Sequence, residues 1–300
     1  TDKTKGIILA LLGPGLWGIM GIFIRPLYEV GITCIDITFV RCAIGALCYY
    51  AFVKLVNPTA LEVTTKGFII CILYGVCSYG IGFTSYSVAV TRIPVAIATV
   101  LMFTAPVWVT ILNMIIFRDK PTRNQVIAIV LCFIGAILAA DVISVNLGAP
   151  LDPLGIIMSL VNSLGMATQL IIPRIFHGQF QKDTMITYGF LGTSLVCMFF
   201  TNFGHFSVLL HGGPHVGRTI ICLIAMGVLC TFLSNGSYVK ASEFLDTVSV
   251  SILSAIEVVV GAIVGFLVFH ESITLLQGIG AVIICFGALY PNIMEKINEL

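Results

Sequence analysis

Charged side chains are scarce in this chain, where they make up 10% of 300 residues, against roughly 25% in an average soluble domain. Hydrophobic residues make up 58%, and the mean hydropathy is +1.08. A chain this apolar cannot keep its surface in water, which excludes a soluble enzyme or binding module. The formal net charge is only +1, and no basic patch of the kind that binds nucleic acids occurs. The composition therefore predicts a protein whose surroundings are membrane lipids.

The motifs of common catalytic and metal chemistries are also missing. No G-x-x-x-x-G-K-[ST] phosphate loop occurs, which excludes an ATP-driven pump within this chain. None of the ten cysteines stands in a C-x-x-C pair, so we expect no metal, cofactor or redox site and interpret them as packing residues. No Cys or carboxylate joins His211 and His215, near His205, so we expect no metal there either.

Ten apolar segments are long enough to cross a bilayer, since a spanning helix needs about 20 apolar residues. They cover approximately residues 6–26, 34–53, 67–87, 93–117, 123–141, 153–173, 184–202, 218–239, 247–269 and 274–292. The connections between these spans are short, and no soluble catalytic domain fits between them. The acidic residues that a mid-membrane protease would pair lie near the span ends instead, so we expect no enzyme activity: Asp36, Asp141, Asp152 and Asp246.

Basic residues predict the orientation, because Lys and Arg accumulate in cytoplasmic loops. With residue 1 inside, most of them fall in cytoplasmic connections, and the outer connections hold only Arg25, Arg92 and Arg218. We therefore expect both ends of the chain to be cytoplasmic. The membrane would be the plasma membrane, of the bacterial inner-membrane type.

The C-terminal half of the chain repeats the N-terminal half. The stretch from Gly75 to Ala136 is echoed without a gap by Gly227 to Ala288, and the matches include Ser85/Ser237, Tyr86/Tyr238, Thr122/Thr274 and Gln125/Gln277. Five spans in each copy, an odd number, make the second copy enter the membrane in the opposite sense. We therefore predict an all-α membrane protein of ten transmembrane helices in two inverted five-helix repeats, residues 1–149 and 150–300. Inverted repeats are typical of transporters.

Glu257 is the most informative single residue. It lies about ten residues into the span 247–269, roughly 15 Å deep at ~1.5 Å per residue, near the middle of a ~30 Å hydrocarbon core. A charge there costs at least a few kcal/mol, which favours a carboxylate that binds substrate or carries a proton, or one neutralised by a structural partner. Arg41 lies at a compatible depth and either pairs with Glu257 or binds an anionic group of the substrate. Asp36 is a competing partner for Arg41.

Aromatic and polar residues within the spans could complete a cavity. Rings can stack on a planar substrate or hold a cation, whereas uncharged polar side chains can bind a solute or join helices. We expect Tyr86 and Tyr238 at the membrane interface instead. Pro14 and Pro106 break their helices and are candidate gating hinges. The candidate cavity residues are Glu257, Arg41, Trp17, Tyr79, Ser78, Trp108, Asn162, Gln169, Thr231 and Asn235.

Short motifs add a family resemblance. The first span carries Leu16-Trp17-Gly18, the fourth carries Thr104-Ala105-Pro106-Val107, and an acidic turn, Asp119 or Glu271, precedes the fifth and tenth. With the ten inverted spans, the whole chain resembles the drug/metabolite transporter superfamily, and its EamA-type members in particular. One departure is that Val258 follows Glu257 where members often have proline, which leaves a kink at that point open.

The resemblance implies a central cavity lined by spans one to four and six to nine, with spans five and ten outside it. It also implies small metabolites, including amino acids, as substrates and export as the direction. We therefore predict a secondary, non-ATP transporter of small polar metabolites, amino acids or related compounds first, that works by alternating access. The alternatives are a proton-coupled carrier of organic cations or amines that uses Glu257 and aromatic rings, and a membrane receptor or scaffold.

Overall fold

Helices form all the regular structure of the described residues in this computed structural model, which are 2–142, 151–210, 215–270 and 272–298. The N-terminal half contains α1 (Asp2–Gly18), α2 (Gly21–Glu29), α3 (Cys34–Val56), η1 (Pro58–Leu61), α4 (Thr65–Gly75), η2 (Val76–Ile81), α5 (Gly82–Val90), α6 (Val95–Met102), α7 (Ala105–Leu112), η3 (Asn113–Phe117) and α8 (Arg123–Ala139). The C-terminal half contains α9 (Pro153–Ile175), α10 (Lys182–Met198), η5 (Phe203–Phe206), α11 (Ser207–Leu210), α12 (Val216–Gly227), η6 (Val228–Leu233), α13 (Ser234–Ala241), α14 (Thr247–Leu253), α15 (Ile256–Phe269) and α16 (Leu275–Asn298).

Each of the ten predicted spans contains a helix. Seven helical segments are both long and apolar enough to cross a membrane: Asp2–Glu29, Cys34–Val56, Thr65–Val90, Val95–Phe117, Pro153–Ile175, Val216–Ala241 and Thr247–Phe269. The fifth and tenth spans form the shorter apolar helices Arg123–Ala139 and Leu275–Pro291, and the seventh corresponds to the 17 residues of α10. The all-α membrane architecture is therefore confirmed.

Local backbone features recur at the repeat shift of 152 residues. The π-helical turns η2 and η6 are one such pair, and the left-handed residues Arg118 and His270 that end the fourth and ninth spans are another. Helical breaks also correspond, after Met102 in the fourth span and after Leu253 in the ninth. The same reciprocal hydrogen bonds, between a threonine and a glutamine three residues later, start α8 and α16: Thr122 with Gln125, and Thr274 with Gln277.

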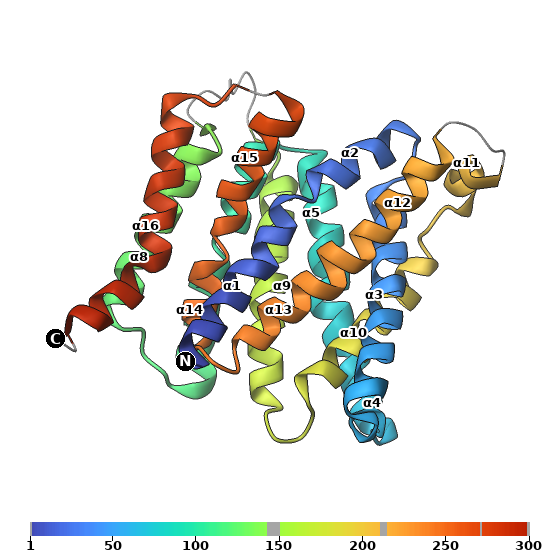
Figure 1. Ribbon diagram of the computed structural model, residues 1–300, viewed down its shortest axis with the longest axis horizontal. Coiled ribbons are helices and arrows are strands. Elements are labelled where there is room, and N and C mark those ends of the chain that lie inside the picture. Colours follow the sequence, from blue (N-terminus) through green and yellow to red (C-terminus); the bar gives the residue numbers. More distant parts are fainter. Residues whose placement is uncertain (1, 143–150, 211–214, 271, 299–300) are drawn as a thin grey trace.

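Contacts between the two halves also come in corresponding pairs. Helix α1 packs on α13 as α9 packs on α5, and α3 packs on α12 as α10 packs on α4. Helix α3 lies against its counterpart α10, and α8 lies against its counterpart α16. Figure 1 shows α8 and α16 together at one edge of the bundle, with both chain ends at the same end of the molecule. We call that end the termini end and the opposite end the far end.

The α8–α16 contact brings two backbones unusually close together. A Cβ atom added to Gly280 would lie 2.4 Å from the Ala139 amide nitrogen and 2.7 Å from the Gly135 carbonyl oxygen. Ile284 and Cys132 are buried in the same interface. Small residues allow such approach between membrane helices, where association depends on close packing.

We expect Gly280→Ala to separate α16 from α8, because the added methyl group meets backbone atoms that cannot move aside. Overpacking of this kind costs about 1–3 kcal/mol of unfolding free energy, which thermal unfolding of the purified protein would show as a lower midpoint. Gly278→Ala is the matched control, since a Cβ at Gly278 has no neighbour within 4 Å and alanine favours helix. Equal midpoints for the two variants would contradict the prediction.

Candidate functional site

A cavity of about 170 Å³ lies inside the bundle, where α1, α2, α3, α5, α6, α9 and α15 meet. We call it the central cavity. Its wall runs from Trp17 and Glu257 in mid-span to Tyr28, Cys34 and Val90, which stand near the far ends of their helices. The full lining is Trp17, Met20, Ile24, Tyr28, Cys34, Ile37, Thr38, Arg41, Phe83, Tyr86, Ser87, Val90, Met102, Asn162, Met166, Gln169 and Glu257. Both halves of the chain therefore contribute to one cavity.

Glu257 stands in the first turn of α15, directly after a helical break. Ser254 contributes to this break, because its Oγ donates to the Ser251 carbonyl at 2.6 Å, and the Glu257 amide bonds to the Ser254 carbonyl at 3.1 Å. The ninth span is thus interrupted although the residue after Glu257 is a valine and not a proline. Glu257 Oε2 is buried and has no hydrogen-bond partner among the described residues. Such an oxygen is costly to leave unpaired, so it is a ready acceptor for a ligand.

Arg41 reaches the cavity from α3 and is 5% exposed. Its Nε donates to Thr231 Oγ1 at 2.7 Å and its Nη2 to the Cys230 carbonyl at 2.7 Å, both in the π-helical turn η6. Its Nη1 contacts the Met20 sulfur at 3.3 Å, and the guanidinium lies 4.5 Å from the centre of the Phe83 ring. Turns of this kind are frequent at functional sites. Here the turn holds a buried cation in place.

No ion pair joins Arg41 and Glu257 in the part of the chain that the structure describes, although both line the central cavity. Asp36 is not the competing partner either. Its carboxylate accepts hydrogen bonds from Thr33 at the start of α3, at 2.9 and 2.6 Å, and from the Asn202 amide at 3.1 Å. Arg41 and Glu257 are therefore not neutralised by either of the carboxylate–guanidinium pairs that the sequence suggested.

His205 completes the Asp36 network, with its Nδ1 2.6 Å from a carboxylate oxygen. Residues 211–214, which include part of the predicted histidine segment, lie outside the described residues. Elsewhere in the chain, within the described ranges, no three metal-ligating side chains come together.

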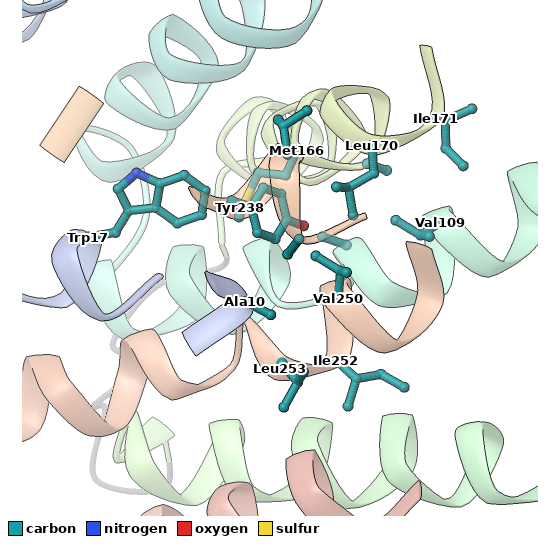
Figure 2. Close-up of a cluster of buried hydrophobic side chains, with 14 of the residues drawn as sticks. Ala10, Trp17, Val109, Met166, Leu170, Ile171, Tyr238, Val250, Ile252 and Leu253 are labelled. Atoms are coloured by element: carbon teal, nitrogen blue, oxygen red, sulfur yellow. The ribbon is translucent and has the colours of Figure 1, made fainter. Parts of the chain in front are cut away.

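Unpaired polar atoms concentrate around the cavity. Trp17 Nε1, Asn162 Oδ1, Gln169 Oε1 and Glu257 Oε2 are buried, have no hydrogen-bond partner among the described residues, and belong to side chains that line it. The Tyr238 ring packs against the Trp17 indole, with 5.2 Å between the two ring centroids (Figure 2). Since buried polar groups are nearly always hydrogen-bonded, this cluster indicates a site for a polar ligand or ordered water.

Five predicted cavity residues do not line the central cavity, and one of them is Thr231, the partner of Arg41. The Tyr79 hydroxyl is 2.9 Å from that of Tyr74, and its ring packs on Phe190. Ser78 shares a 2.8 Å hydrogen bond with Thr168 and so joins two helices. Trp108 packs against the core, and Asn235 Nδ2 donates to the Thr231 carbonyl. Depth along a helix sets the level of a residue but not its direction, and the π-helical turns change that direction further.

Several lining residues escaped the sequence analysis. Tyr86, expected at the membrane interface, lines the central cavity, and its hydroxyl is 3.0 Å from the Thr99 hydroxyl. Tyr238, expected at the same interface, is fully buried. A signal for the α5 face was present, because Phe83, Tyr86, Ser87 and Val90 recur at helical spacing. The methionines Met20, Met102 and Met166 carry no comparable pattern.

The proline hinges lie beside breaks rather than on the cavity wall. Pro106 is the second residue of α7, directly after the break in the fourth span, and it is buried. Pro14 is buried within α1, which ends at Gly18 before α2 starts. Their gating role stays a prediction.

The comparison with known families now decides the class of protein. A model of the EamA-like transporter family matches residues 4–140 and again residues 153–292. The chain belongs to the EamA-like transporter family. It is thus a multi-pass membrane transporter of the drug/metabolite transporter superfamily, and this is not a family of enzymes.

Relatives and a solved structure agree with this assignment. An uncharacterized transporter of Archaeoglobus fulgidus is 24% identical over 286 residues, which cover 93% of each chain. An uncharacterized transporter of Helicobacter pylori is 22% identical over 312 residues, which cover 98% of each. A crystal structure of a protein with 12% identity superimposes with a TM-score of 0.80 over 99% of both chains, which shows the same fold.

We expect Thr231→Val to destabilise this EamA-like transporter. The substitution removes the acceptor of Arg41 Nε and leaves a donor of a buried guanidinium unpaired, which costs about 1–3 kcal/mol. Thr231→Ser keeps the hydroxyl and is the matched control. Thermal unfolding of the purified proteins should show a lower midpoint for the valine variant alone, and a similar loss in both variants would contradict this role of the hydroxyl.

Proposed function

We propose that this transporter is a secondary carrier that exports small polar metabolites, amino acids or related compounds first, across the plasma membrane. The observation that carries the proposal is a central cavity whose wall holds Arg41 and Glu257 without an ion pair between them. A free amino acid carries a carboxylate and an ammonium group, which are the partners that these two side chains accept. The unpaired atoms of Asn162, Gln169 and Trp17 add hydrogen-bonding capacity to the same wall.

Alternating access is supported by how the two ends of the bundle differ. Near the termini end, Asn113 donates to Thr247 at 2.8 Å, and α14 packs on α7. Two further links join the halves there, Gln125 to Asp246 at 2.9 Å and Arg174 to Asp119 at 2.5 Å. Toward the far end, the wall of the central cavity continues to Tyr28, Cys34 and Val90, in the helical turns nearest that end. In the proposed cycle, the bundle opens at the termini end while it closes at the far end.

We also propose that the halves, residues 1–149 and 150–300, are inverted repeats with both chain ends in the cytoplasm. The corresponding contacts between halves support this arrangement, as does the packing of α8 and α16, in which Gly280 approaches Ala139 while Gly287 approaches Cys132, so the helices are antiparallel. In that orientation the wall of the central cavity leads toward the outside. Inverted repeats allow the inward and outward states to arise by exchange of conformation between the halves.

Thiol labelling tests this orientation. Cys34 lines the central cavity near the far end and is partly exposed, so a charged, membrane-impermeant thiol reagent added outside intact cells should modify it. Labelling of the Cys34 peptide is measured by mass spectrometry, with Cys34→Ser as the control. Labelling only from the cytoplasmic side of inverted vesicles would contradict the proposed orientation.

A second candidate is a proton-coupled carrier of organic cations or amines. The favouring observation is that Glu257 Oε2 has no partner in the described part of the chain, while the Trp17 and Tyr86 rings line the same cavity. Aromatic faces attract cations. This candidate has no use for the positive charge of Arg41, and that difference separates the two.

Counterflow with purified protein in liposomes discriminates between them. We expect accumulation of labelled amino acids in vesicles loaded with unlabelled amino acids, and a loss of about tenfold or more in both Glu257→Gln and Arg41→Gln, since each removes a charge-assisted hydrogen bond. Exposed Glu62→Gln and Arg123→Gln are the matched controls. Accumulation of amines that survives in Arg41→Gln and fails in Glu257→Gln would favour the second candidate. If neither pool gives accumulation, with protein shown to be folded, the substrate belongs to a different chemical class.

A further inference from the structure

A second cavity, of about 380 Å³, adjoins the central cavity between α6 and α15. We call it the side cavity. Its lining is Trp17, Gly18, Tyr86, Val95, Ala96, Thr99, Met102, Phe103, Ala139, Ala140, Glu257, Val258, Gly261, Ala262 and Gln277. Trp17, Tyr86, Met102 and Glu257 line both cavities. Glu257 is therefore accessible from two directions.

The packing of the fourth and ninth spans explains the side cavity. Their segments near the termini end, α7 and α14, pack on each other, whereas beyond the two breaks α6 packs on α9 and α15 packs on α1. Small side chains, among them Ala96 and Ala262, keep the resulting space open. The wall extends to Ala139 at the end of α8 and to Gln277 in the first turn of α16, both at the far end.

The two cavities differ in charge. Of the described residues that line the side cavity, only Glu257 is charged, and the wall is otherwise mostly apolar. Arg41 lines the central cavity but not the side cavity. A molecule with one positive group therefore meets a single complementary carboxylate in the side cavity, beside the Trp17 ring, and the apolar wall lies alongside. This arrangement complements an ammonium head with an apolar tail.

We propose that the side cavity is a separate binding site for an amphiphilic ammonium ion, with its head at Glu257 and a single alkyl chain along α6 and α15. The ammonium group donates a hydrogen bond to Glu257 Oε2, the buried oxygen that has no partner among the described residues. The chain lies against Val95, Phe103 and Val258. Because the head occupies Glu257, the bound ion competes with a substrate of the central cavity, and this competition rests on the proposed function.

Gly261 offers a way to fill the side cavity alone. A Cβ added there has the Gly18 carbonyl oxygen as its nearest neighbour, at 3.8 Å, so a Cβ atom fits without a clash. Gly261→Leu therefore reduces the space for the alkyl chain. Gly217→Leu is the matched control, because Gly217 is exposed on α12, lines neither cavity, and has nothing within 4 Å of an added Cβ.

Binding can be measured without transport. The chain has two tryptophans, so Trp108→Phe leaves Trp17 as its only indole, on the wall of both cavities, and excitation at the red edge of the indole band avoids the tyrosines. The probes are alkylammonium ions with a terminal bromine, which quenches indole at contact, and chains of six, eight and ten carbons. The variants are compared in nanodiscs after thermal unfolding has shown that each is folded.

We expect saturable quenching, with affinity that rises by up to about fourfold per methylene as the chain is buried. Glu257→Gln should lower the affinity about tenfold or more, because the charge-assisted contact is lost, and Gly261→Leu should remove the dependence on chain length, which Gly217→Leu keeps. Quenching that does not saturate and follows lipid content, or is unchanged in Gly261→Leu, would overturn the proposal.

The same probes in wild-type counterflow separate this inference from the proposed function. Inhibition of amino-acid counterflow at the concentrations that quench Trp17 supports both. Saturable quenching without any counterflow keeps the side cavity as a binding site and removes the proposed transport function. Active counterflow that the probes do not inhibit, despite saturable quenching, overturns the shared use of Glu257.

Discussion

A buried guanidinium must receive its hydrogen-bond acceptors from the protein, because little water is present. The arrangement of the central cavity depends on the acceptors that the protein supplies to Arg41. The acceptors come from the turn η6 of the eighth span, which offers the Thr231 hydroxyl and the Cys230 carbonyl on the face toward α3. Unpaired charges are expensive at this depth. Because the protein supplies these acceptors, Arg41 stays at the cavity wall without an internal carboxylate, and Glu257 Oε2 has no hydrogen-bond partner among the described residues.

This arrangement explains why the charged residues do not neutralise each other. A direct Arg41–Glu257 pair would satisfy both groups and leave a ligand little to bind. The contacts of Arg41 to η6, Met20 and Phe83 instead hold the cation by neutral groups. The break before Glu257 places this residue in the first turn of a new helix, α15. Its carboxylate likewise makes no ion pair with Arg41. The two charged residues therefore line one cavity without an ion pair between them.

The sequence predicted the framework more completely than the site. Apolar length located the ten helices, and the repeated residues Thr122/Thr274 and Gln125/Gln277 make the same hydrogen bonds at the starts of α8 and α16. Depth placed Glu257 and Arg41 at one level. The direction of a side chain around its helix was not predictable in the third span, where the π-helical turn η2 points Tyr79 at Phe190 and leaves Tyr86 on the cavity.

The corresponding contacts of the two π-helical turns are chemically different. Thr231 in η6 and Tyr79 in η2 are equivalent at the shift of 152 residues, yet Thr231 holds Arg41 of the second span whereas Tyr79 packs on Phe190 of the seventh. A symmetric dimer of one half would have the same residue, either two threonines or two tyrosines, at these two positions. Because the halves are joined in a single polypeptide, the two positions can carry different residues. One copy can then specialise in polar contacts, while the other becomes a rigid aromatic support.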